Sequence, residues 1–292
     1  MKDEEKKKRS HTSFILPPSS FILPKKRFGQ NFLVDDRVVE RIVREVCPRD
    51  DETIVEIGPG RGALTSRLVE SAGQLVAIEF DRDLIPLLQE KFSGSANFTL
   101  VEADALAVDL CKLIEPAAKT RVVANLPYYI STAILKRLIE QRACLAEMVL
   151  MLQREVAERI TAQPASPERG FLSVLIEAYC LTETLFNVAP TAFRPVPKVR
   201  SSVVRLRVRP EIAVGMGDES LLWRVVSAGF AQRRKTIFNN LRSAPADLLS
   251  RIEEAGGAIT VLEKAGIESK RRAETLTLEE WAGLTQTIAE CG

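Results

Sequence analysis

The fold of this chain is decided by Thr53–Thr65, which reads TIVEIGPGRGALT. The apolar, β-branched start is typical of a buried strand, and the glycines after it form a loop that leads into a helix beginning near Leu64. Glycine has no Cβ, so a ligand can approach such a loop closely. Gly58, Gly60 and Ala63 satisfy the G-x-G-x-x-G/A nucleotide fingerprint, and this loop alone leaves both NAD and S-adenosylmethionine open as cofactors.

Two acidic side chains stand at the ends of the next two predicted strands. Gln74–Glu79 is an apolar stretch that ends in an acid, and Phe98–Val101 is followed shortly by Asp104. In an open parallel sheet, ligands bind at the carboxyl ends of the strands, and an acid about 20 residues beyond the glycine loop accepts hydrogen bonds from ribose hydroxyls. We therefore expect Glu79 to bind the ribose of an adenosine cofactor and Asp104 to meet its adenine amine.

A fourth strand end carries the tetrapeptide Asn125-Leu126-Pro127-Tyr128, which follows Val122–Ala124. An amide oxygen and a backbone carbonyl accept hydrogen bonds from an exocyclic amine, and proline has no N–H that would compete. The tyrosine ring offers a surface on which a planar base stacks. Together, the four strand ends predict a site in which a nucleoside cofactor meets an amine-bearing base.

With these motifs in this order, the chain resembles the KsgA-type rRNA adenine dimethyltransferases from about Lys25 to the C-terminus. Beyond the segments quoted above, the resemblance rests on FGQNFL (28–33), EFD (79–81), QREVA (153–157), GFLSV (170–174), FRPVPKV (193–199), QRRKT (232–236) and RAE (272–274). It implies an α/β fold, with a Rossmann-like S-adenosylmethionine-dependent methyltransferase domain and a small all-α C-terminal domain. The chain departs from some relatives at Tyr129, where asparagine is common, and at Phe171.

The resemblance also assigns the site residues. Contacts with the cofactor, S-adenosylmethionine, fall on Gln30, Asn31, Leu33, Gly58, Gly60, Glu79, Asp104 and Asn125. The catalytic positions are Asn125, Leu126, Pro127 and Tyr128, which receive the target adenine, with Phe193 expected on the other face of the base. Helix capping and turn formation are the alternative roles for Gln30 and Asn31, and they are compatible with cofactor binding. Core packing is the alternative for Tyr128 and Phe193.

Positive charge is concentrated late in the chain, although the formal net charge is only +2. Residues 198–242 contain ten Lys or Arg and three acids, which predicts an anionic partner for this segment. We expect the RNA contacts to be made by Arg233, Arg234, Lys235, Lys198 and Arg200. The resemblance implies that the partner is small-subunit rRNA within the pre-ribosomal small subunit. It implies that the product is N6,N6-dimethyladenosine at two adjacent adenosines of a hairpin loop near the 3′ end.

The chain divides into four predicted parts: a disordered tail at 1–24, the methyltransferase domain at 25–209, a linker at 210–219 and a helical RNA-binding domain at 220–292. Strands and helices alternate through the second part, which favours a sheet with helices on both faces. Asp35 and Asp36 open the first helix of this part, and Pro48 ends it. Ser173–Tyr179 and Ser202–Val208 are expected to be late strands at an antiparallel edge.

Residue types argue against several other kinds of site. The five cysteines include no C-x-x-C pair and predict a reduced, cytoplasmic protein. The single histidine, His11, lies in the polar tail, so we expect neither a metal site nor histidine-dependent catalysis. No apolar run is long enough to span a membrane, and we expect a monomer.

Three other functions are open at this point. A large-subunit rRNA adenine methyltransferase of the antibiotic-resistance type would share the cofactor motifs, but the long helical domain favours the small-subunit enzyme. An NAD-dependent dehydrogenase would explain the glycines and Glu79 but not Asn125–Tyr128. A ribosome-assembly factor, for which binding matters more than methylation, is compatible with the enzyme.

Overall fold

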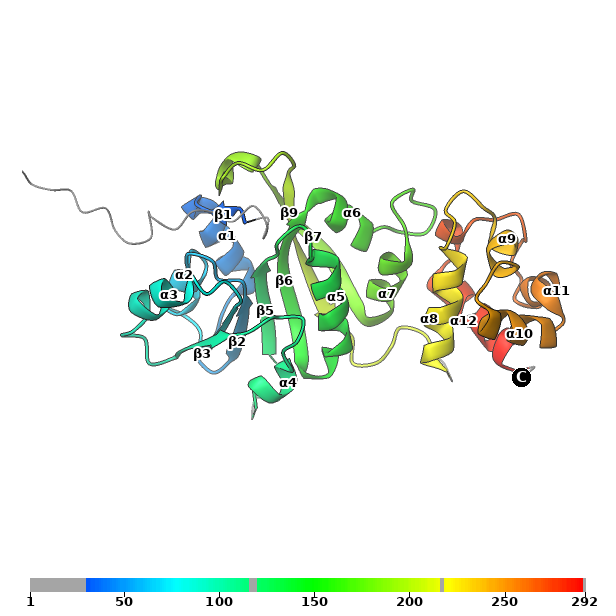
Figure 1. Cartoon of the computed structure of the whole chain (residues 1–292), viewed down its shortest axis with the longest axis horizontal. Coiled ribbons are helices and arrows are strands. Elements are labelled where there is room, and N and C mark those ends of the chain that lie inside the picture. The colour runs from blue at the N-terminus through cyan, green and yellow to red at the C-terminus, as the bar shows by residue number, and fades with distance from the viewer. Residues whose placement is uncertain (1–29, 116–119, 216–217, 291–292) are drawn as a thin grey trace, which may run out of the picture.

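The computed structural model describes residues 30–115, 120–215 and 218–290. Its strands are β1 (Phe32–Leu33), β2 (Thr53–Ile57), β3 (Gln74–Glu79), β4 (Phe98–Glu102), β5 (Thr120–Asn125), β6 (Leu145–Gln153), β7 (Cys180–Val188), β8 (Phe193–Arg194) and β9 (Ser201–Val208). Seven of them form one sheet in the order β4-β3-β2-β5-β6-β9-β7, and β1 pairs separately with β8. Figure 1 shows this sheet in the body of an elongated molecule. The predicted tail, residues 1–24, lies outside the described residues.

The helices fall into two groups along the chain. The first group is α1 (Asp36–Val46), α2 (Thr65–Leu68), α3 (Ile85–Lys91), α4 (Leu110–Leu113), α5 (Ser131–Glu140), α6 (Arg154–Ile160) and α7 (Phe171–Tyr179), with short 3-10 helices η3 (Arg142–Cys144) and η4 (Pro190–Ala192). The second is α8 (Glu219–Gly229), α9 (Ile237–Leu241), α10 (Ala246–Glu254), α11 (Gly257–Lys264) and α12 (Leu278–Ala289), with η5 (Ala273–Thr275). Within the described residues, none of these helices is both long enough and apolar enough to cross a bilayer.

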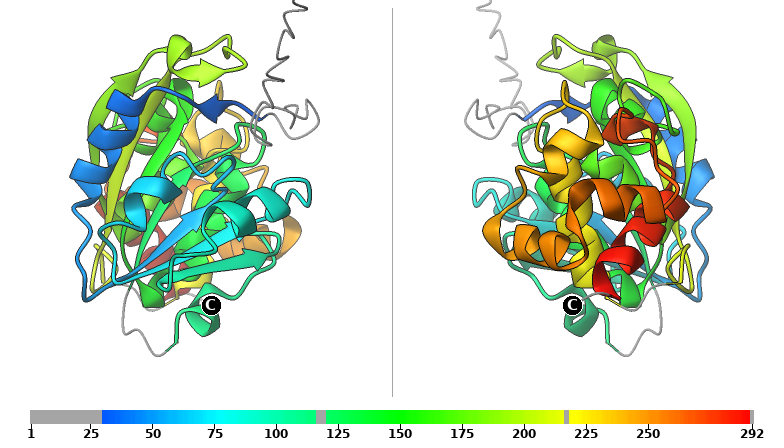
Figure 2. Two further views of the ribbon diagram at one scale, coloured as in Figure 1. Left: turned by 90° about the vertical axis from the view of Figure 1, so that its left-hand side faces the viewer. Right: turned by 90° about the vertical axis from the view of Figure 1, so that its right-hand side faces the viewer.

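The second group of helices forms one end of the molecule and packs against α7 (Figure 1, Figure 2). The fold is therefore the predicted Rossmann-like α/β body with a helical C-terminal region. The central strands of the body are parallel: β3 and β5 flank β2, β4 pairs with β3, and β6 pairs with β5. In this register Ile57 lies opposite both Ile78 and Ala124, so the carboxyl ends of three strands are level.

The far part of the sheet is antiparallel, but only one of the two predicted late strands is correct. β9 lies antiparallel between β6 and β7, which confirms the prediction for Ser202–Val208. The prediction for Ser173–Tyr179 is wrong, because these residues belong to helix α7. Leu172–Ile176 are all buried, so the apolar positions of α7 show no helical period. The Gly170 N–H donates to Ser173 Oγ at 2.9 Å where the helix begins.

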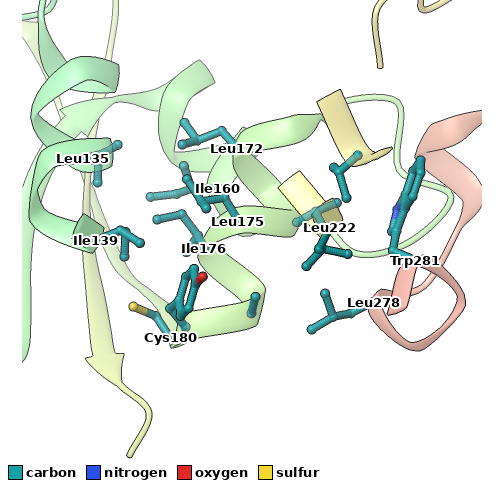
Figure 3. Close-up of a cluster of buried hydrophobic side chains, with 14 of the residues drawn as sticks. Leu135, Ile139, Ile160, Leu172, Leu175, Ile176, Cys180, Leu222, Leu278 and Trp281 are labelled. Atoms are coloured by element: carbon teal, nitrogen blue, oxygen red, sulfur yellow. The ribbon is translucent and has the colours of Figure 1, made fainter. Parts of the chain in front are cut away.

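Apolar side chains cover both faces of the sheet. On one face, α1 and α2 contribute Val39, Ile42 and Leu68. On the other face, a larger cluster runs from the sheet through α5 and α7 into α8 and α12. Figure 3 shows part of this cluster, from Leu135 and Ile139 through Leu175 and Ile176 to Leu222 and Trp281. The hydrophobic core is thus continuous from the sheet to the C-terminal helices, and the predicted domain limits at 209 and 220 stay a prediction.

Helix α1 begins where the sequence predicts. Asp35 is its N-cap and accepts a hydrogen bond from the Arg37 N–H at 3.0 Å. Cys47 adopts a left-handed conformation that ends the helix just before Pro48. The capping role considered for Gln30 and Asn31 therefore belongs to Asp35.

Two cysteines are paired, which corrects the prediction of reduced thiols. Cys111 in α4 and Cys144 in η3 form a disulfide, with their Cα atoms 5.4 Å apart. They lie 33 residues apart in the chain, so the sequence spacing gives no sign of their contact. Cys47 and Cys180 are free, and Cys291 lies outside the described residues.

The contact between α8 and α12 leads to a first prediction. Trp281 in α12 is fully buried, and a Cβ added at Gly229 would overlap its ring. We expect Gly229→Ala to lower the free energy of unfolding by about 1–3 kcal/mol, because the extra carbon overpacks the core. Denaturant unfolding measures this change.

Gly283→Ala is the matched control. Gly283 also lies in α12, and a Cβ there would have no neighbour within 4 Å. The substitution should raise the free energy of unfolding slightly, since alanine favours a helix interior by up to about 1 kcal/mol over glycine. Equal stabilities for the two variants would contradict the predicted clash.

Candidate active site

A cavity of about 290 Å³ opens at the carboxyl ends of β2, β3, β4 and β5. Residues that are far apart in the chain line this cavity, and the strand ends and motifs had predicted most of them as site residues. The predicted residues that line it are Gln30, Asn31, Leu33, Gly58, Gly60, Glu79, Asp104, Asn125, Leu126, Pro127 and Tyr128. Phe193 is the one predicted cofactor or catalytic residue that does not line it.

The glycine loop after β2 is held in a conformation that favours glycine. Gly58 and Gly60 have φ angles of 69° and 59°, in the left-handed region. The Gly58 N–H donates to the Ile78 carbonyl at 2.9 Å, which ties the loop to β3. Lys91 Nζ donates to the carbonyls of Arg61 and Gly62, both at 3.2 Å. The loop is therefore braced from two sides and leaves its backbone facing the cavity.

Glu79 is a buried carboxylate at the end of β3 that accepts three backbone hydrogen bonds. Its Oε1 accepts from the N–H groups of Phe80 at 2.9 Å and Asp81 at 2.8 Å, and its Oε2 accepts from Gly60 at 3.2 Å. Burial raises the pKa of Glu79, and these hydrogen bonds oppose the rise. A carboxylate has about four acceptor sites, so about one is left for a ligand hydroxyl.

The segment before α1 closes one side of the cavity. Its strand β1 pairs antiparallel with β8, which places Leu33 opposite Phe193. Gln30 Nε2 donates to Asp81 Oδ2 at 2.7 Å and links this segment to the end of β3. The Phe32 ring lies so close to the glycine loop that a Cβ at Gly60 would sit 3.2 Å from it. Gln30 and Asn31 therefore reach the cavity because the β1–β8 pair and Asp81 hold them there.

The Asn125–Tyr128 tetrapeptide lines the wall of the cavity beyond β5. Asn125 lines the cavity, and its Nδ2 donates to the Asn31 carbonyl at 3.3 Å, which leaves Oδ1 as an acceptor for a ligand. Leu126 is buried and its N–H donates to the Met151 carbonyl at 3.1 Å, so the turn is fixed to β6. The Tyr128 hydroxyl and Ser201 Oγ share a hydrogen bond of 2.9 Å. Burial raises the pKa of Tyr128, so its phenol stays protonated at neutral pH.

Phe193 lies in the core instead of the cavity. It is 1% exposed and packs in the apolar cluster with Leu33 and Val203. The alternative considered for it, core packing, is what the structure shows, and stacking of Phe193 on a base is not supported. The physical reason is the β1–β8 pairing, which turns this residue toward the sheet.

Among the other residues that line the cavity, Glu56, Phe80 and Tyr129 were given no role in the site from the sequence. Glu56 in β2 is fully buried and accepts a hydrogen bond of 2.6 Å from Thr65 Oγ1. Glu56 could have been found in the sequence as the single acid in a predicted strand that is otherwise largely apolar. Phe80 and Tyr129 are 57% and 56% exposed, yet both line the cavity. Their signal was their position directly after Glu79 and Tyr128.

The residues predicted to bind RNA are exposed but do not line this cavity. Arg233, Arg234 and Lys235 lie in the loop between α8 and α9, and Lys198 and Arg200 lie in the loop between β8 and β9. Figure 1 and Figure 2 show both loops along one edge of the molecule. Arg233 also donates to the Pro167 carbonyl, which joins the α8–α9 loop to the loop before α7. Arg224 in α8 pairs with Asp247 in α10.

No cysteine, methionine or histidine is among the described residues that line the cavity. Across the described part of the chain, no cluster of three or more His, Cys, Asp and Glu side chains is arranged to hold a metal ion. The lone histidine of the sequence, His11, lies outside that part.

Comparison with solved structures defines the class of protein. The 23S rRNA methyltransferase ErmE shares the fold, with a TM-score of 0.66 and 28% identity over 89% of this chain and all of that one. A dimethyladenosine transferase from Plasmodium falciparum has a TM-score of 0.75 and 22% identity over 89% of this chain and 98% of that one, which shows the fold alone. The fold is that of a Rossmann-like methyltransferase.

Comparison of sequences shows the family. A family model described as ribosomal RNA adenine dimethylase matches residues 23–284. Relatives named ribosomal RNA small subunit methyltransferase A are 44% identical in Clostridium botulinum (strain Loch Maree / Type A3), over 90% of this chain and 93% of that protein, and 41% identical in Hahella chejuensis, over 90% and 92%. The chain belongs to the ribosomal RNA adenine dimethylase family, and the predicted resemblance is confirmed.

The buried Glu56 leads to a prediction about pH. Burial raises its pKa from 4.5 to about 7, and the nearby Glu79 carboxylate adds to this, while the Thr65 hydroxyl and Lys91 oppose it. Between these two pH values the folded protein binds more protons than the unfolded chain, so stability falls as pH rises. Relative to Glu56→Gln, the wild-type free energy of unfolding should fall on the order of 3 kcal/mol across that window and then stay level.

Denaturant unfolding at a series of pH values measures this difference. Glu155→Gln, at an exposed position, is the control and should give a difference from the wild type that hardly varies with pH. A constant difference for Glu56→Gln would show that Glu56 ionises normally in the folded protein.

Proposed function

We propose that this protein transfers methyl groups from S-adenosylmethionine to the N6 amines of two adjacent adenosines, which lie in a hairpin loop near the 3′ end of small-subunit rRNA. The observation that carries the proposal is the cavity, which joins the glycine loop, Glu79, Asp104 and Asn125–Tyr128 at one sheet edge. The relatives named ribosomal RNA small subunit methyltransferase A support the choice of RNA.

The residues of the cavity fit a positively charged nucleoside cofactor. Two buried carboxylates, Glu56 and Glu79, line one end of it. Glu79 keeps about one acceptor site for a ribose hydroxyl, and Asp104 is exposed at the next strand end, where an adenine amine would meet it. S-adenosylmethionine supplies a methyl group made electrophilic by its positive sulfur. We assign its binding to the predicted set that lines the cavity, from Gln30 and Asn31 to Asn125.

The chain's own contribution to the reaction is the placement of the adenine amine. That amine is a poor nucleophile, because its lone pair is delocalised into the ring. Asn125 Oδ1 and one backbone carbonyl of Leu126-Pro127 accept the two N–H groups of the amine, which localises the lone pair and directs it at the methyl group. Because Pro127 has no N–H, no donor at that position competes.

Tyr128 supplies the stacking surface for the target base. Its ring lines the cavity, and the hydrogen bond to the buried Ser201 fixes its orientation. Base–aromatic stacking is worth about 1–3 kcal/mol per base, which offsets much of the cost of unstacking an adenine. Bases in a hairpin loop are already splayed, so a loop suits this site. The exposed rings of Phe80 and Tyr129 also line the cavity and offer further aromatic surfaces in place of Phe193.

The substrate implies the surroundings in which the protein works. We propose that it acts as a monomer on the pre-ribosomal small subunit in the cytoplasm. The second candidate is methylation of large-subunit rRNA, which the structural similarity to the 23S rRNA methyltransferase ErmE favours.

The test is methylation of small subunits that lack the modification. We expect the protein and S-adenosylmethionine to dimethylate two adjacent loop adenosines, mapped by mass spectrometry of nuclease fragments. Asn125→Ala should lower turnover about a hundredfold or more, since one fixed hydrogen-bonding group in an active site is worth about that factor. Its affinity for small subunits should change far less. Methylation confined to large-subunit RNA would select the second candidate.

RNA binding by the α8–α9 loop is tested through salt. Arg234 and Lys235 are both exposed, and replacing them with alanine should reduce the slope of log K against log salt by up to about 2, about one unit for each lost phosphate contact. Arg251→Ala with Lys264→Ala is the control, because these exposed cations lie on α10 and α11, away from that loop. Equal slopes for the two double variants would place the RNA contact elsewhere.

A further inference from the structure

A second cavity lies close to the position of the target base. Its volume is about 280 Å³, and it is lined by Gln153, Arg154, Glu155, Glu158, Val199 and Arg200. None of these residues lines the first cavity. Ser201 separates the two: it bonds to the Tyr128 hydroxyl, follows Arg200 directly and lies opposite Gln153 in the sheet. Ser201, which contacts Tyr128, and Arg200, which lines the second cavity, are neighbours in the chain, so their Cα atoms are about 4 Å apart. We call this second cavity the groove.

The walls of the groove are held by main-chain bonds. Gln153 ends β6 and pairs with Ser201 of β9. The Arg154 N–H, at the start of α6, donates to the Arg200 carbonyl at 3.0 Å. The groove thus forms part of the sheet edge and its shape is present before any ligand binds.

The side chains of the groove suit a nucleobase. Val199 is 43% exposed and offers an apolar contact surface. The half-buried Gln153 amide has no hydrogen bond to another described residue, and glutamine recognises adenine through paired hydrogen bonds to its N6 and N7. Arg200 is exposed, and guanidinium planes stack on unstacked RNA bases.

The charges of the groove favour a base over a phosphate. Glu155 and Glu158 bring two carboxylates to its lining. Arg154 Nε neutralises one of them, with 2.6 Å to Glu158 Oε1. A carboxylate repels phosphate but accepts a hydrogen bond from an exocyclic amine. An amine-bearing base is therefore the better occupant, and the exposed cations Lys198 and Arg200 of the same loop are left for the RNA backbone.

We propose that this groove binds the adenosine that neighbours the target, so that the two adjacent adenosines occupy the groove and the first cavity at the same time. This inference rests on the proposed function. It makes Gln153 and Val199 binding residues for the waiting adenosine, which then exchanges into the first cavity for its own methylation.

The test uses small subunits reconstituted with rRNA in which one of the two adenosines is replaced by an abasic nucleotide, each position in turn. With the wild-type protein, the abasic neighbour should raise KM for the remaining adenosine about tenfold with little change in kcat, because the lost contact is made before and during methyl transfer. Gln153→Ala and Val199→Ser should show a similarly raised KM on unaltered RNA and less than about a twofold further rise on abasic RNA.

Val196→Ser is the matched control. Val196 lies in the same loop and is 54% exposed, but it does not line the groove, so this variant should respond to the abasic neighbour as the wild type does. Cofactor affinity and melting temperature, measured for all variants, identify any that fail to fold. If the Gln153 and Val199 variants respond to the abasic neighbour as fully as the wild type, the groove proposal is overturned. If the wild-type KM is the same with and without the neighbouring base, the groove proposal is overturned and the proposed function stands. If no small subunit is methylated, the proposed function is overturned as well.

Discussion

The parallel register of four strands is the constraint on which the site depends. β2 pairs with β3 and β5 so that Ile57 faces both Ile78 and Ala124, and Glu79 lies opposite Glu102 in β4. Residues from four separate parts of the chain therefore reach one edge at the same height. A slip of one residue would turn every side chain of a strand to the other face of the sheet. Glu79 secures this arrangement, because its buried carboxylate binds N–H groups of the glycine loop and of its own turn.

Much of the site was predictable, since short motifs at strand ends carry both local structure and chemistry. The glycine loop, Glu79 and Asn125–Tyr128 each follow an apolar run, and all three line the cavity. Asp35 likewise marks the first helix in the sequence and caps it in the structure. In these cases a few adjacent residues determine the conformation, and tertiary packing agrees with the local preference.

Other features depend on contacts that the sequence does not display. Helix α7 lies between the sheet and α8 and is buried nearly all round, which removes the polar stripe by which a helix is recognised. The position of Phe193 is set by the pairing of two-residue strands 161 residues apart, β1 and β8, too short to predict from a pattern. The Cys111–Cys144 pair depends in the same way on the packing of α4 against η3. The groove beside Ser201 joins residues 153–158 to Val199 and Arg200, and the sequence does not show that these two segments are adjacent.

The unbroken core between the sheet and the C-terminal helices has a consequence for how members of this family diverge. Because α7 presents one surface to the sheet and another to α8 and α12, it has no solvent-facing side on which substitutions accumulate freely. A change in the C-terminal helices that alters their packing must be matched by a change in α7. Exchange of C-terminal regions between relatives should therefore succeed when α7 travels with the helices and fail when the junction falls between Tyr179 and Glu219. The segment that can be exchanged as a whole is therefore defined by the core contacts of α7, and not by the chain between α7 and α8.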